Sequence, residues 1–414
     1  MLKDKHIVLG VTGSIAAYKA AELASRLAQE GALVEVIMTR SAQEFVAPLT
    51  FQTLTQLPVI TDMFRLLSEM NIAHVALAQR ADLVLIAPAT ANTIAKLAHG
   101  LADDMLSATV LATRAPVLIA PAMETNMYEN PVTQANLASL VARGMTVVEP
   151  KVGHLASGRY GKGRMADPAV ILAMAKQALG RDGDLAGRRV VVTAGGTQEP
   201  LDPVRFVGNR SSGKMGYALA QAALERGAQV KLISAPTRLS PPPGAKTEFV
   251  TTAAEMRDAV MGSIVDADAL IMAAAVADYR PAEVARQKIK KASRGLTLRL
   301  RPNPDILMEV AEYRRSTGKP SLVVGFAAET EDLAANARAK LEAKGLDLIV
   351  ANDVTSSDSG FDSDTNRALI MDRLGQTSEL PLLAKSELAD RVLDHVVELF
   401  RNAGPHLEQT APPA

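Results

Sequence analysis

Cysteine and tryptophan are both absent from this chain, and aromatic residues make up only 3% of it. Without cysteine there is no disulfide, no zinc–thiolate site, no iron–sulfur cluster and no thiol nucleophile. The same absence is compatible with a reducing cytoplasm, where we expect the protein to act. The scarcity of aromatic residues disfavours a platform on which single-stranded nucleic acid would stack.

An excess of charge of one sign and long hydrophobic runs are also missing. Lysine plus arginine and aspartate plus glutamate number 45 each, so the formal net charge is zero. That balance argues against a broad basic surface for nucleic acid or an anionic membrane, so phosphate groups must be bound at local sites. No stretch of about 18 or more residues is both apolar and uncharged, which disfavours a membrane span.

Short β-branched runs alternate with segments of helical period. Residues 6–12 (HIVLGVT) predict a strand, and residues 15–31 predict a helix with apolar side chains at i, i+3, i+4 and i+7. Further strands are predicted at 33–39, 82–88 and 116–122. These continuous apolar runs are typical of a parallel sheet that is covered on both faces. The alternation therefore predicts a doubly wound α/β fold.

The second half of the chain repeats this arrangement. A strand is predicted at 188–196, a helix at 213–228 and another strand at 230–234. At about 150 residues per domain, the chain accommodates two or three domains. The sequence thus predicts an α/β protein of two doubly wound (Rossmann-like) domains, at 1–181 and 188–400. A polar linker at 182–187 would join them, and a disordered tail would follow at 401–414.

Two candidate ligand positions lie at the ends of N-terminal strands. Gly13 and Ser14 stand between the first strand and the first helix, where free N–H groups favour an anion. The turn reads GVTGSI and not GxGxxG, which favours a mononucleotide phosphate over NAD. Thr90 and Asn92 follow the strand at 82–88, at the usual ligand edge of an open α/β sheet. Helix capping is the simpler alternative for these polar residues.

A histidine and a glycine-rich segment are further candidates. His74 falls in the first turn of a predicted helix capped by Asn71, where a neutral imidazole is favoured and can act as a base. A structural role is the commoner one for a lone histidine. Residues 153–165 (GHLASGRYGKGRM) carry too many glycines for a helix or a packed strand. We expect a flexible loop whose Arg159, Lys162 and Arg164 suit a lid over an anionic substrate, or else a mobile surface loop.

Six motifs within residues 1–180 resemble those of the flavin-dependent cysteine decarboxylases. The resemblance is closest to the phosphopantothenoylcysteine decarboxylases of coenzyme A synthesis, and the motifs are His74, the loop 153–165, GSIAAYK (13–19), PATANTIAK (88–96), GLADDMLS (100–107) and PAMETNMY (121–128). It implies that Gly13, Ser14, Thr90 and Asn92 hold FMN and that His74 is the active-site base. In that family the flavin oxidises the substrate thiol, which lets CO₂ leave, and then returns the electrons.

Two residues depart from that family's pattern. In many members the PAM motif is followed by an asparagine that contacts the substrate carboxylate. Here that position is Glu124, whose charge would repel the carboxylate unless the side chain is protonated or turned away. Asn126 is then a candidate replacement, beside Met123 and Arg164 as substrate contacts. A catalytic cysteine of many relatives is here Ser157, and a hydroxyl is a far weaker acid than a thiol, which should slow a late proton transfer.

The C-terminal half carries a second group of candidate residues. Residues 208–215 (GNRSSGKM) fall short of a P-loop, because Met215 replaces the hydroxyl that would hold Mg²⁺. A helix opening there can still cradle a phosphate. The expected strand that ends at Asp278 offers a carboxylate for Mg²⁺ or a ribose. Three lysines are also candidates: Lys288 in KIKK, and Lys340 and Lys344 on one helix face. Each would either bind phosphate or form part of a solvated surface.

This half resembles phosphopantothenate–cysteine ligase over about 187–400, through VTAGGTQEPLDPVRFVGNRSSGKMG (192–216), AAAVADYRP (273–281) and KIKK (288–291). The resemblance implies that CTP and Mg²⁺ activate the carboxylate of 4′-phosphopantothenate as an acyl-cytidylate, from which the amine of cysteine displaces CMP. It assigns Asn209 and Arg205 to the acyl intermediate and Lys288 to its formation. The nucleotide or metal contacts would be Ser211, Ser212, Gly213, Ala274, Asp278, Phe326, Lys340 and Lys344.

Three interpretations follow from these observations. In the first, the chain ligates cysteine to phosphopantothenate and then decarboxylates the product to 4′-phosphopantetheine. In the second, the N-terminal domain binds FMN only for assembly or regulation, as Ser157 and Glu124 suggest. The third is an NAD(P) oxidoreductase, against which the missing GxGxxG counts. The resemblance also implies a homo-oligomer, with trimeric contacts between N-terminal domains and dimeric contacts between C-terminal domains.

Overall fold

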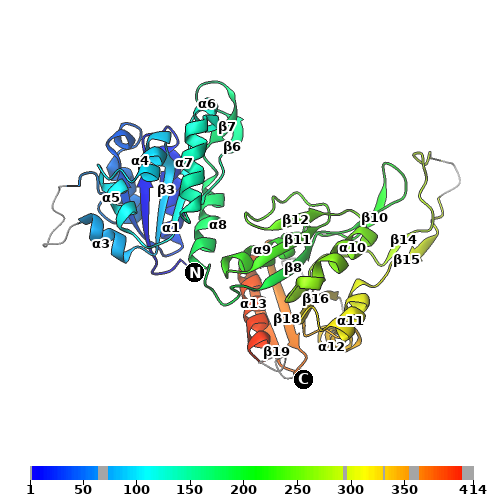
Figure 1. The fold of residues 1–414 in the computed structure, drawn as a ribbon. Helices are drawn as coiled ribbons and strands as arrows, with labels where there is room; N and C mark the ends of the chain where they lie inside the picture. The colour runs from blue at the N-terminus through cyan, green and yellow to red at the C-terminus, as the bar shows by residue number, and fades with distance from the viewer. Residues whose placement is uncertain (1, 64–72, 292–295, 330–331, 354–362, 403–414) are drawn as a thin grey trace, which may run out of the picture. The chain divides into compact units, whose positions relative to one another are not determined.

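The computed structural model describes residues 2–63, 73–291, 296–329, 332–353 and 363–402. The chain forms two compact units that meet between Gly180 and Arg181, and each is an α/β structure (Figure 1). This confirms the predicted fold class. Residues 401–402 of the expected tail instead complete a helix that ends at Asn402, and its residues 403–414 and the expected helix cap Asn71 lie outside the described residues. Within those residues, no helix has the length and apolarity needed to cross a membrane.

The N-terminal unit is built on one parallel sheet, with the strand order β2-β1-β3-β4-β5. Its strands are β1 (His6–Val11), β2 (Leu33–Met38), β3 (Leu83–Ala89), β4 (Val117–Pro121) and β5 (Thr146–Val147). The side chains of β3 and β4 are buried along their whole length. The continuous apolar runs in the sequence are thus strands that are covered on both faces.

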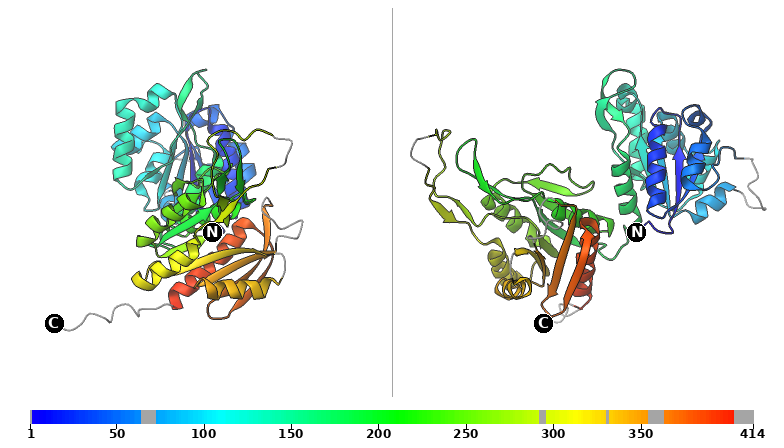
Figure 2. Two further views of the ribbon diagram at one scale, coloured as in Figure 1. Left: turned by 90° about the vertical axis from the view of Figure 1, so that its right-hand side faces the viewer. Right: turned by 180° about the vertical axis from the view of Figure 1, so that it is seen from behind.

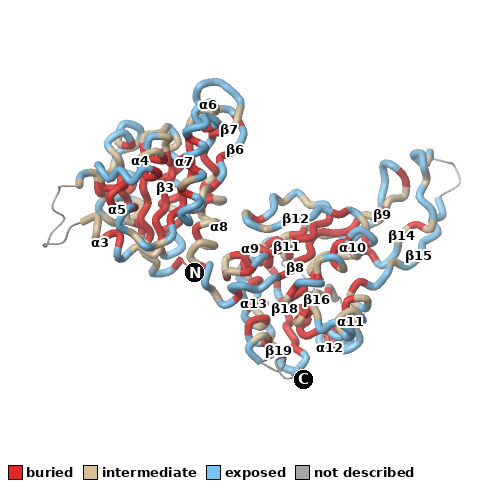
Figure 3. Tube along the Cα trace, in the orientation of Figure 1, coloured by how far each residue is buried: buried red, intermediate tan, exposed pale blue. Residues whose placement is uncertain are grey.

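Helices cover both faces of this sheet. They are α1 (Ala17–Gln29), η1 (Arg40–Glu44), α2 (Pro48–Thr55), α3 (Ala73–Arg80), α4 (Ala91–His99), α5 (Met105–Ala112), α6 (Thr125–Glu129), α7 (Pro131–Ala142) and α8 (Pro168–Leu179). Successive residues of a strand point to opposite faces. Leu9 therefore packs in a buried cluster with Leu23 of α1, whereas Val8 packs in another with Leu97 and Leu106 of α4 and α5. The strand β3 is buried within this unit (Figure 3).

The glycine-rich segment expected to be a flexible loop is instead a β-hairpin. Its antiparallel strands are β6 (Lys151–His154) and β7 (Tyr160–Arg164). Glycine is required there by close packing: at Gly163 φ is 149°, and an added Cβ would collide with the carbonyl oxygen of Met123. The prediction was wrong because glycine density was interpreted as flexibility. Here it allows the hairpin backbone to approach the segment that follows β4.

The C-terminal unit has an eight-stranded sheet in the order β12-β11-β8-β13-β16-β17-β18-β19. The strands are β8 (Arg189–Ala194), β11 (Gln229–Ser234), β12 (Lys246–Phe249), β13 (Ala269–Met272), β16 (Leu322–Glu329), β17 (Leu348–Asp353), β18 (Thr365–Asp372) and β19 (Thr377–Ala384). The first six strands in that order run parallel, and β18 and β19 continue the sheet antiparallel. That antiparallel pair was not among the predicted strands.

The helices of this unit are α9 (Lys214–Glu225), α10 (Ala253–Ser263), η2 (Ile264–Asp266), α11 (Ile306–Thr317), α12 (Leu333–Ala343) and α13 (Lys385–Asn402). Helices α9 and α13 pack on one face of the sheet, and α10, α11 and α12 pack on the other (Figure 2). Two short strand pairs lie outside the sheet, formed by β9 (Gln198–Pro200) with β10 (Phe206–Gly208) and by β14 (Tyr279–Pro281) with β15 (Leu300–Pro302).

The segment expected to be a linker packs on the C-terminal unit. Leu185 is fully buried in the cluster under α9 and α13. Asp184 accepts a hydrogen bond of 2.8 Å from Nε of Arg226, whose side chain also pairs with Asp394 at 2.9 Å. Burial of one apolar side chain within an otherwise polar segment explains the difference from the expectation, since the composition of 182–187 alone gives no sign of it.

Candidate active sites

A cavity of about 500 Å³ lies at the carboxyl ends of β1, β3 and β4 in the N-terminal unit. Thr12 fixes two of its walls, because its hydroxyl donates to the carbonyl oxygen of Pro88 (2.7 Å) and accepts from the N–H of Thr90 (3.1 Å). The candidates gathered in this cavity are Gly13, Ser14, Thr90, Asn92 and Met123. The structure therefore brings together residues that are up to 110 positions apart in the sequence, at the edge where open sheets bind ligands.

Capping accounts for only part of this polar set. Thr90 is the N-cap of α4, accepting from the N–H of Thr93 at 3.4 Å. Ser14 is not the cap of α1; that residue is Ala16, which has no capping side chain. The Ser14 hydroxyl instead accepts from the N–H of Ala16 at 3.3 Å and lines the cavity. Ser14 is thus left in a position to contact a ligand.

Charged groups in this cavity are already balanced. Lys96 lies 2.7 Å from Asp103 and 3.1 Å from Asp104, and the hydrogen bond with Asp103, more than burial, governs its pKa, which is raised. Burial alone would raise the pKa of Asp104, but hydrogen bonds from Ser107 and Lys96 outweigh it and lower the pKa. Arg40 also lines the cavity. These residues were not singled out from the sequence, although GLADDMLS contains both aspartates.

A second cavity of about 380 Å³ shares Ser14, Ala122 and Met123 with the first. The hairpin β6–β7 forms one side of it. It brings together the candidates Glu124, Ser157 and Arg164, and adds two residues that the sequence did not point to, Lys19 and His154. The N-terminal unit thus has two adjoining cavities that are both lined by ionisable groups, and the first is also rich in hydroxyl groups.

The carboxylate of Glu124 is turned toward the backbone. Its Oε2 accepts a 2.6 Å hydrogen bond from the N–H of Asn126, as the N-cap of α6, and Oε1 lies 3.7 Å from Arg159. One carboxylate oxygen of Glu124 is thus held by the backbone, and the residue still lines the second cavity. Asn126 itself is exposed and lines neither cavity described for this unit.

An ion pair links the hairpin to Glu149, which lies outside it. Lys162 lies 2.5 Å from Glu149, which also accepts a 3.1 Å hydrogen bond from the Tyr128 hydroxyl. Hydrogen bonding from Lys162 lowers the pKa of Glu149, and burial followed by the Glu149 charge raises that of Tyr128. Of the three basic residues expected in a lid, only Arg164 lines the cavity.

His74 does not join these candidates within one chain. It is half-buried on α3 and lines neither of the two cavities.

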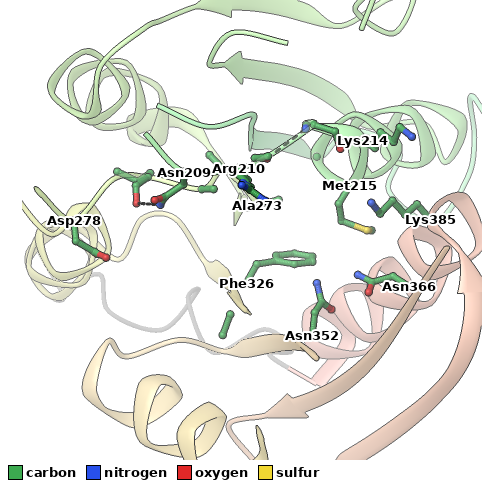
Figure 4. Close-up of a pocket in the computed structure, with 18 of the residues that line it drawn as sticks. Asn209, Arg210, Lys214, Met215, Ala273, Asp278, Phe326, Asn352, Asn366 and Lys385 are labelled. Atoms are coloured by element: carbon green, nitrogen blue, oxygen red, sulfur yellow. Dashed lines mark hydrogen bonds between the residues drawn. The ribbon is translucent and has the colours of Figure 1, made fainter. Parts of the chain in front are cut away.

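The C-terminal unit has a cavity of about 510 Å³ at the N-terminal end of α9. Gly213 starts this helix with φ of 77°, and an added Cβ would lie 2.6 Å from Cγ2 of Thr237. Only glycine therefore fits this approach of the backbone to its neighbours. The predicted residues that line the cavity are Asn209, Ser211, Ser212, Gly213, Ala274, Asp278, Phe326 and Lys340 (Figure 4).

Side chains that the sequence did not single out complete this cavity. They are Arg210, Lys214, Asn352, Asn366 and Lys385 (Figure 4). Lys214 pairs with Asp364 at 2.7 Å, and Lys385 donates to the carbonyl oxygen of Ser363 at 2.6 Å. Three lysines and one arginine therefore face a cavity whose only acidic lining residue within the described chain is Asp278.

Three predicted residues lie away from that cavity. Arg205 pairs with the buried carboxylate of Asp202 at 2.6 Å, and Lys344 lies 3.3 Å from Asp305. The Arg205 guanidinium and several backbone N–H groups lower the pKa of Asp202 well below its ordinary value. One of those donors is the N–H of Ile289 (3.0 Å), so exposed Lys288 adjoins an anchored residue.

Asp278 is placed differently from the expectation. The strand β13 ends at Met272, and Asp278 follows in a loop, exposed and at the cavity rim. Its carbonyl oxygen accepts from the N–H of Asn303 at 2.8 Å, which fixes the loop. Across the described residues no group of three or more acidic, histidine or cysteine side chains gathers to hold a metal. A Mg²⁺ ion here would need oxygens from a bound phosphate, as is usual for this ion.

Comparisons with known proteins divide the chain at the same place. The family described as Flavoprotein matches residues 1–180, and that described as DNA/pantothenate metabolism flavoprotein C-terminal domain matches 185–400. The coenzyme A biosynthesis bifunctional protein CoaBC of Bacillus subtilis is 47% identical over 98% of this chain and 99% of its own. The chain belongs to the CoaBC family.

Members of this family extend to Mycobacterium tuberculosis, whose CoaBC is 45% identical over 95% of this chain and 96% of its own. A crystal structure of a CoaBC C-terminal domain is 38% identical, covers 53% of this chain and 99% of that one, and has a TM-score of 0.45. As a family member, this chain is a bifunctional enzyme of coenzyme A biosynthesis, with a ligase and a decarboxylase activity. This membership confirms the first of the three interpretations at the level of the two activities.

Proposed function

We propose that the C-terminal unit joins cysteine to 4′-phosphopantothenate at the expense of CTP, and that the N-terminal unit decarboxylates the product with FMN. The observation that carries the assignment is the contrast in cavities. A cavity with an excess of basic residues opens at the N-terminus of α9, whereas two cavities, one of them rich in hydroxyl groups, adjoin at Ser14. The first suits a nucleoside triphosphate, and the second pair suits a flavin beside its substrate. The reaction would take place in the cytoplasm.

In the N-terminal unit, the residues present fit FMN. Gly13 and Ser14 lie at the start of α1, and Thr90 and Asn92 at the start of α4, around a cavity of about 500 Å³ that holds Arg40 and Lys96 for a phosphate. When bound, the flavin would supply the oxidation of the thiol and the return of electrons. Arg164 and Met123 would hold the substrate, and Ser157 would face it from the hairpin turn.

His74 would act from a neighbouring subunit. It lines neither cavity of its own unit, and the family resemblance implies trimers with flavin at the subunit contact. Apolar side chains near the cavities are exposed, among them Ile15 (55%) and Tyr18 (60%). In the C-terminal unit, β15 likewise exposes Leu300 (43%). We therefore expect a homo-oligomer built from trimeric N-terminal and dimeric C-terminal contacts.

In the C-terminal unit, the carboxylate oxygen of 4′-phosphopantothenate would attack the α-phosphorus of CTP and expel pyrophosphate. The cysteine amine would then attack the acyl carbon and expel CMP. Ser211, Ser212 and Gly213 would bind phosphate at the start of α9, and Lys340 would offset its charge. Asp278 would help to hold Mg²⁺ together with oxygen atoms of the bound phosphates.

Three further residues would take part in acyl transfer. Asn209 lies in the cavity, its amide donating to the carbonyl oxygen of Val276 at 3.0 Å. Arg205 and Lys288 lie outside it and would join when the substrate is bound, or from the dimer partner. Backbone around Ala274 and Phe326 would bind the cytosine base. Lys344, paired with Asp305, would contribute less than Lys340.

A weak decarboxylase is the second candidate, because Ser157 stands where many relatives carry a catalytic thiol. Mass spectrometry of one reaction decides between the two. Purified protein is mixed with 4′-phosphopantothenate, cysteine, CTP and Mg²⁺. Accumulation of 4′-phosphopantetheine supports both proposed activities. A stall at phosphopantothenoylcysteine leaves the ligase and makes the N-terminal unit an FMN-binding module. Folded protein that forms no pantothenoyl product contradicts the proposal.

A further inference from the structure

Both units hold a buried threonine at the carboxyl edge of the sheet. The first strand of each unit has a parallel neighbour, since β3 pairs with β1 and β13 pairs with β8. Thr12 directly follows β1, and Thr197 comes shortly after β8. Thr12 is 1% exposed and Thr197 is fully buried. Neither lines the cavities described for its unit, so the proposed function gives neither of them a role.

In the N-terminal unit, Thr12 links the end of β1 to the end of β3. Its hydroxyl accepts a 3.1 Å hydrogen bond from the N–H of Thr90 and donates a 2.7 Å hydrogen bond to the carbonyl oxygen of Pro88. The two linked segments both line the cavity in which FMN would lie, through Gly13 on one side and through Thr90 and Asn92 on the other. One hydroxyl therefore sets how far apart these two segments lie.

In the C-terminal unit, Thr197 holds the loop that follows β13. Its hydroxyl accepts a 2.9 Å hydrogen bond from the N–H of Ala277, the residue before Asp278. The same loop accepts the side-chain amide of Asn209 at the carbonyl oxygen of Val276, at 3.0 Å. Asp278 and Asn209 both line the cavity. Thr197 thus lies behind the loop through which two proposed site residues are placed.

The chemistry of these contacts explains why a hydroxyl is needed. Where parallel strands end, the N–H groups of the loops that follow leave the ladder of the sheet and need another acceptor. A valine is similar to threonine in shape but accepts no hydrogen bond, so the N–H would stay unpaired unless the loop moved. Movement of the loop would displace the side chains that line the cavity, although the threonine itself touches no ligand.

We propose that Thr12 and Thr197 are positioning residues, which hold the loop after the neighbouring parallel strand where the ligand requires it. Thr12 would act on FMN binding and Thr197 on nucleotide binding. The identity of the two ligands rests on the proposed function. Open α/β sheets bind ligands in the crevice at the carboxyl ends of the strands. A hydrogen bond that links two adjacent strand ends fixes the width of that crevice.

The two units provide controls for each other in the full-length protein. Thr12→Val should raise the Kd of FMN about 10- to 100-fold, since an N–H loses its acceptor. This Kd is measured by flavin fluorescence, after the flavin is stripped from the protein and titrated back. The KM for CTP in ligation should change less than about 3-fold, because the change lies in the other unit. Thr197→Val should do the reverse, raising the KM for CTP about 10- to 100-fold and leaving the Kd of FMN within about 3-fold.

Rescue variants and a matched control separate positioning from a loss of stability. Thr12→Ser and Thr197→Ser keep the hydroxyl and should bind their ligands within about 3-fold of the wild type. Thr109 of α5 is also fully buried, donates to the carbonyl oxygen of Met105 at 2.8 Å and lines neither cavity of the N-terminal unit. Thr109→Val should leave the Kd of FMN unchanged, whatever its effect on the melting temperature.

Three results overturn the inference while the proposed function stands. They are wild-type affinities in both folded valine variants, weak ligand binding in the serine variants, and a loss of FMN affinity in Thr109→Val equal to that in Thr12→Val. If a valine variant does not fold, Thr12→Ala and Thr197→Ala remove the same hydroxyl groups and give the same comparison. A wild-type protein that binds no FMN and makes no product with CTP contradicts the proposed function together with the inference that rests on it.

Discussion

The two units differ in the balance of charge that lines their cavities. The hydroxyl-lined cavity of the N-terminal unit has two basic residues, Arg40 and Lys96, and two acidic ones, Asp103 and Asp104. The cavity of the C-terminal unit has four basic residues against one acidic residue, namely Arg210, Lys214, Lys340, Lys385 and Asp278. The balanced cavity suits one phosphate group that stays bound, whereas the basic cavity suits a triphosphate with its metal ion.

The same difference explains how a chain of zero net charge could bind anionic substrates. Net charge averages over the whole surface, but each site is decided by a few side chains within about one Debye length, roughly 8–10 Å. The pairs of Lys96 with Asp103 and of Lys214 with Asp364 offset charge in both cavities, but the C-terminal cavity keeps the larger excess of basic residues. We therefore expect ligation to respond to single charge changes more strongly than flavin binding does.

The largest effect is expected from a variant of the helix start in the C-terminal unit. Gly213→Val places a β-branched side chain at φ of 77° and against Thr237, so the turn that would cradle phosphate must move. Loss of aligned N–H donors should lower ligation about 10²- to 10³-fold. Decarboxylation of supplied phosphopantothenoylcysteine should be unchanged, as measured by CO₂ release. A parallel loss of both activities would contradict the division of labour.

A lysine pair on α12 sharpens the comparison with a matched control. Lys340 lines the cavity, whereas Lys344, one turn later, pairs with Asp305. Lys340→Met should raise KM for CTP about 10- to 100-fold, since a charge-assisted contact to phosphate is lost. Lys344→Met should change KM less than about 3-fold, because an exposed ion pair contributes little. Equal effects would show that bound nucleotide draws both lysines into the site.

Ser157→Cys tests the N-terminal unit. The hydroxyl of Ser157 lines the cavity shared with Glu124 and Arg164. A thiol with a pKa of about 8.5 is a far better proton donor than a hydroxyl. If proton transfer limits turnover, decarboxylation should become about 10-fold faster, as single-turnover kinetics would show. An unchanged rate would mean that another step limits the reaction or that another group donates; Ser157→Ala then serves as the control.

The sequence was informative where a residue's environment is local. The continuous apolar run of β3 correctly predicted that this strand is buried on both faces. The motifs around Ser14 and Thr90 lie in one cavity because both follow parallel strands. The hairpin β6–β7 was not predicted, because its glycines are required by close contacts with a segment that is distant in the sequence. Asn352 and Asn366 were missed because only the antiparallel pairing of β17 with β18 makes them neighbours.

The smallest effect is expected from the anchor beside Lys288. Asp202 has a pKa lowered chiefly by Arg205, so it stabilises the folded unit above its unfolded pKa of about 3.9, and this contribution is lost as pH falls below that value. The melting temperature of the wild type should therefore drop more steeply between about pH 5 and pH 3 than that of Asp202→Asn. Asp266→Asn, which removes an exposed partner of Arg189, should follow the wild type. Parallel curves for all three would show that Asp202 does not hold the segment around Ile289 in place.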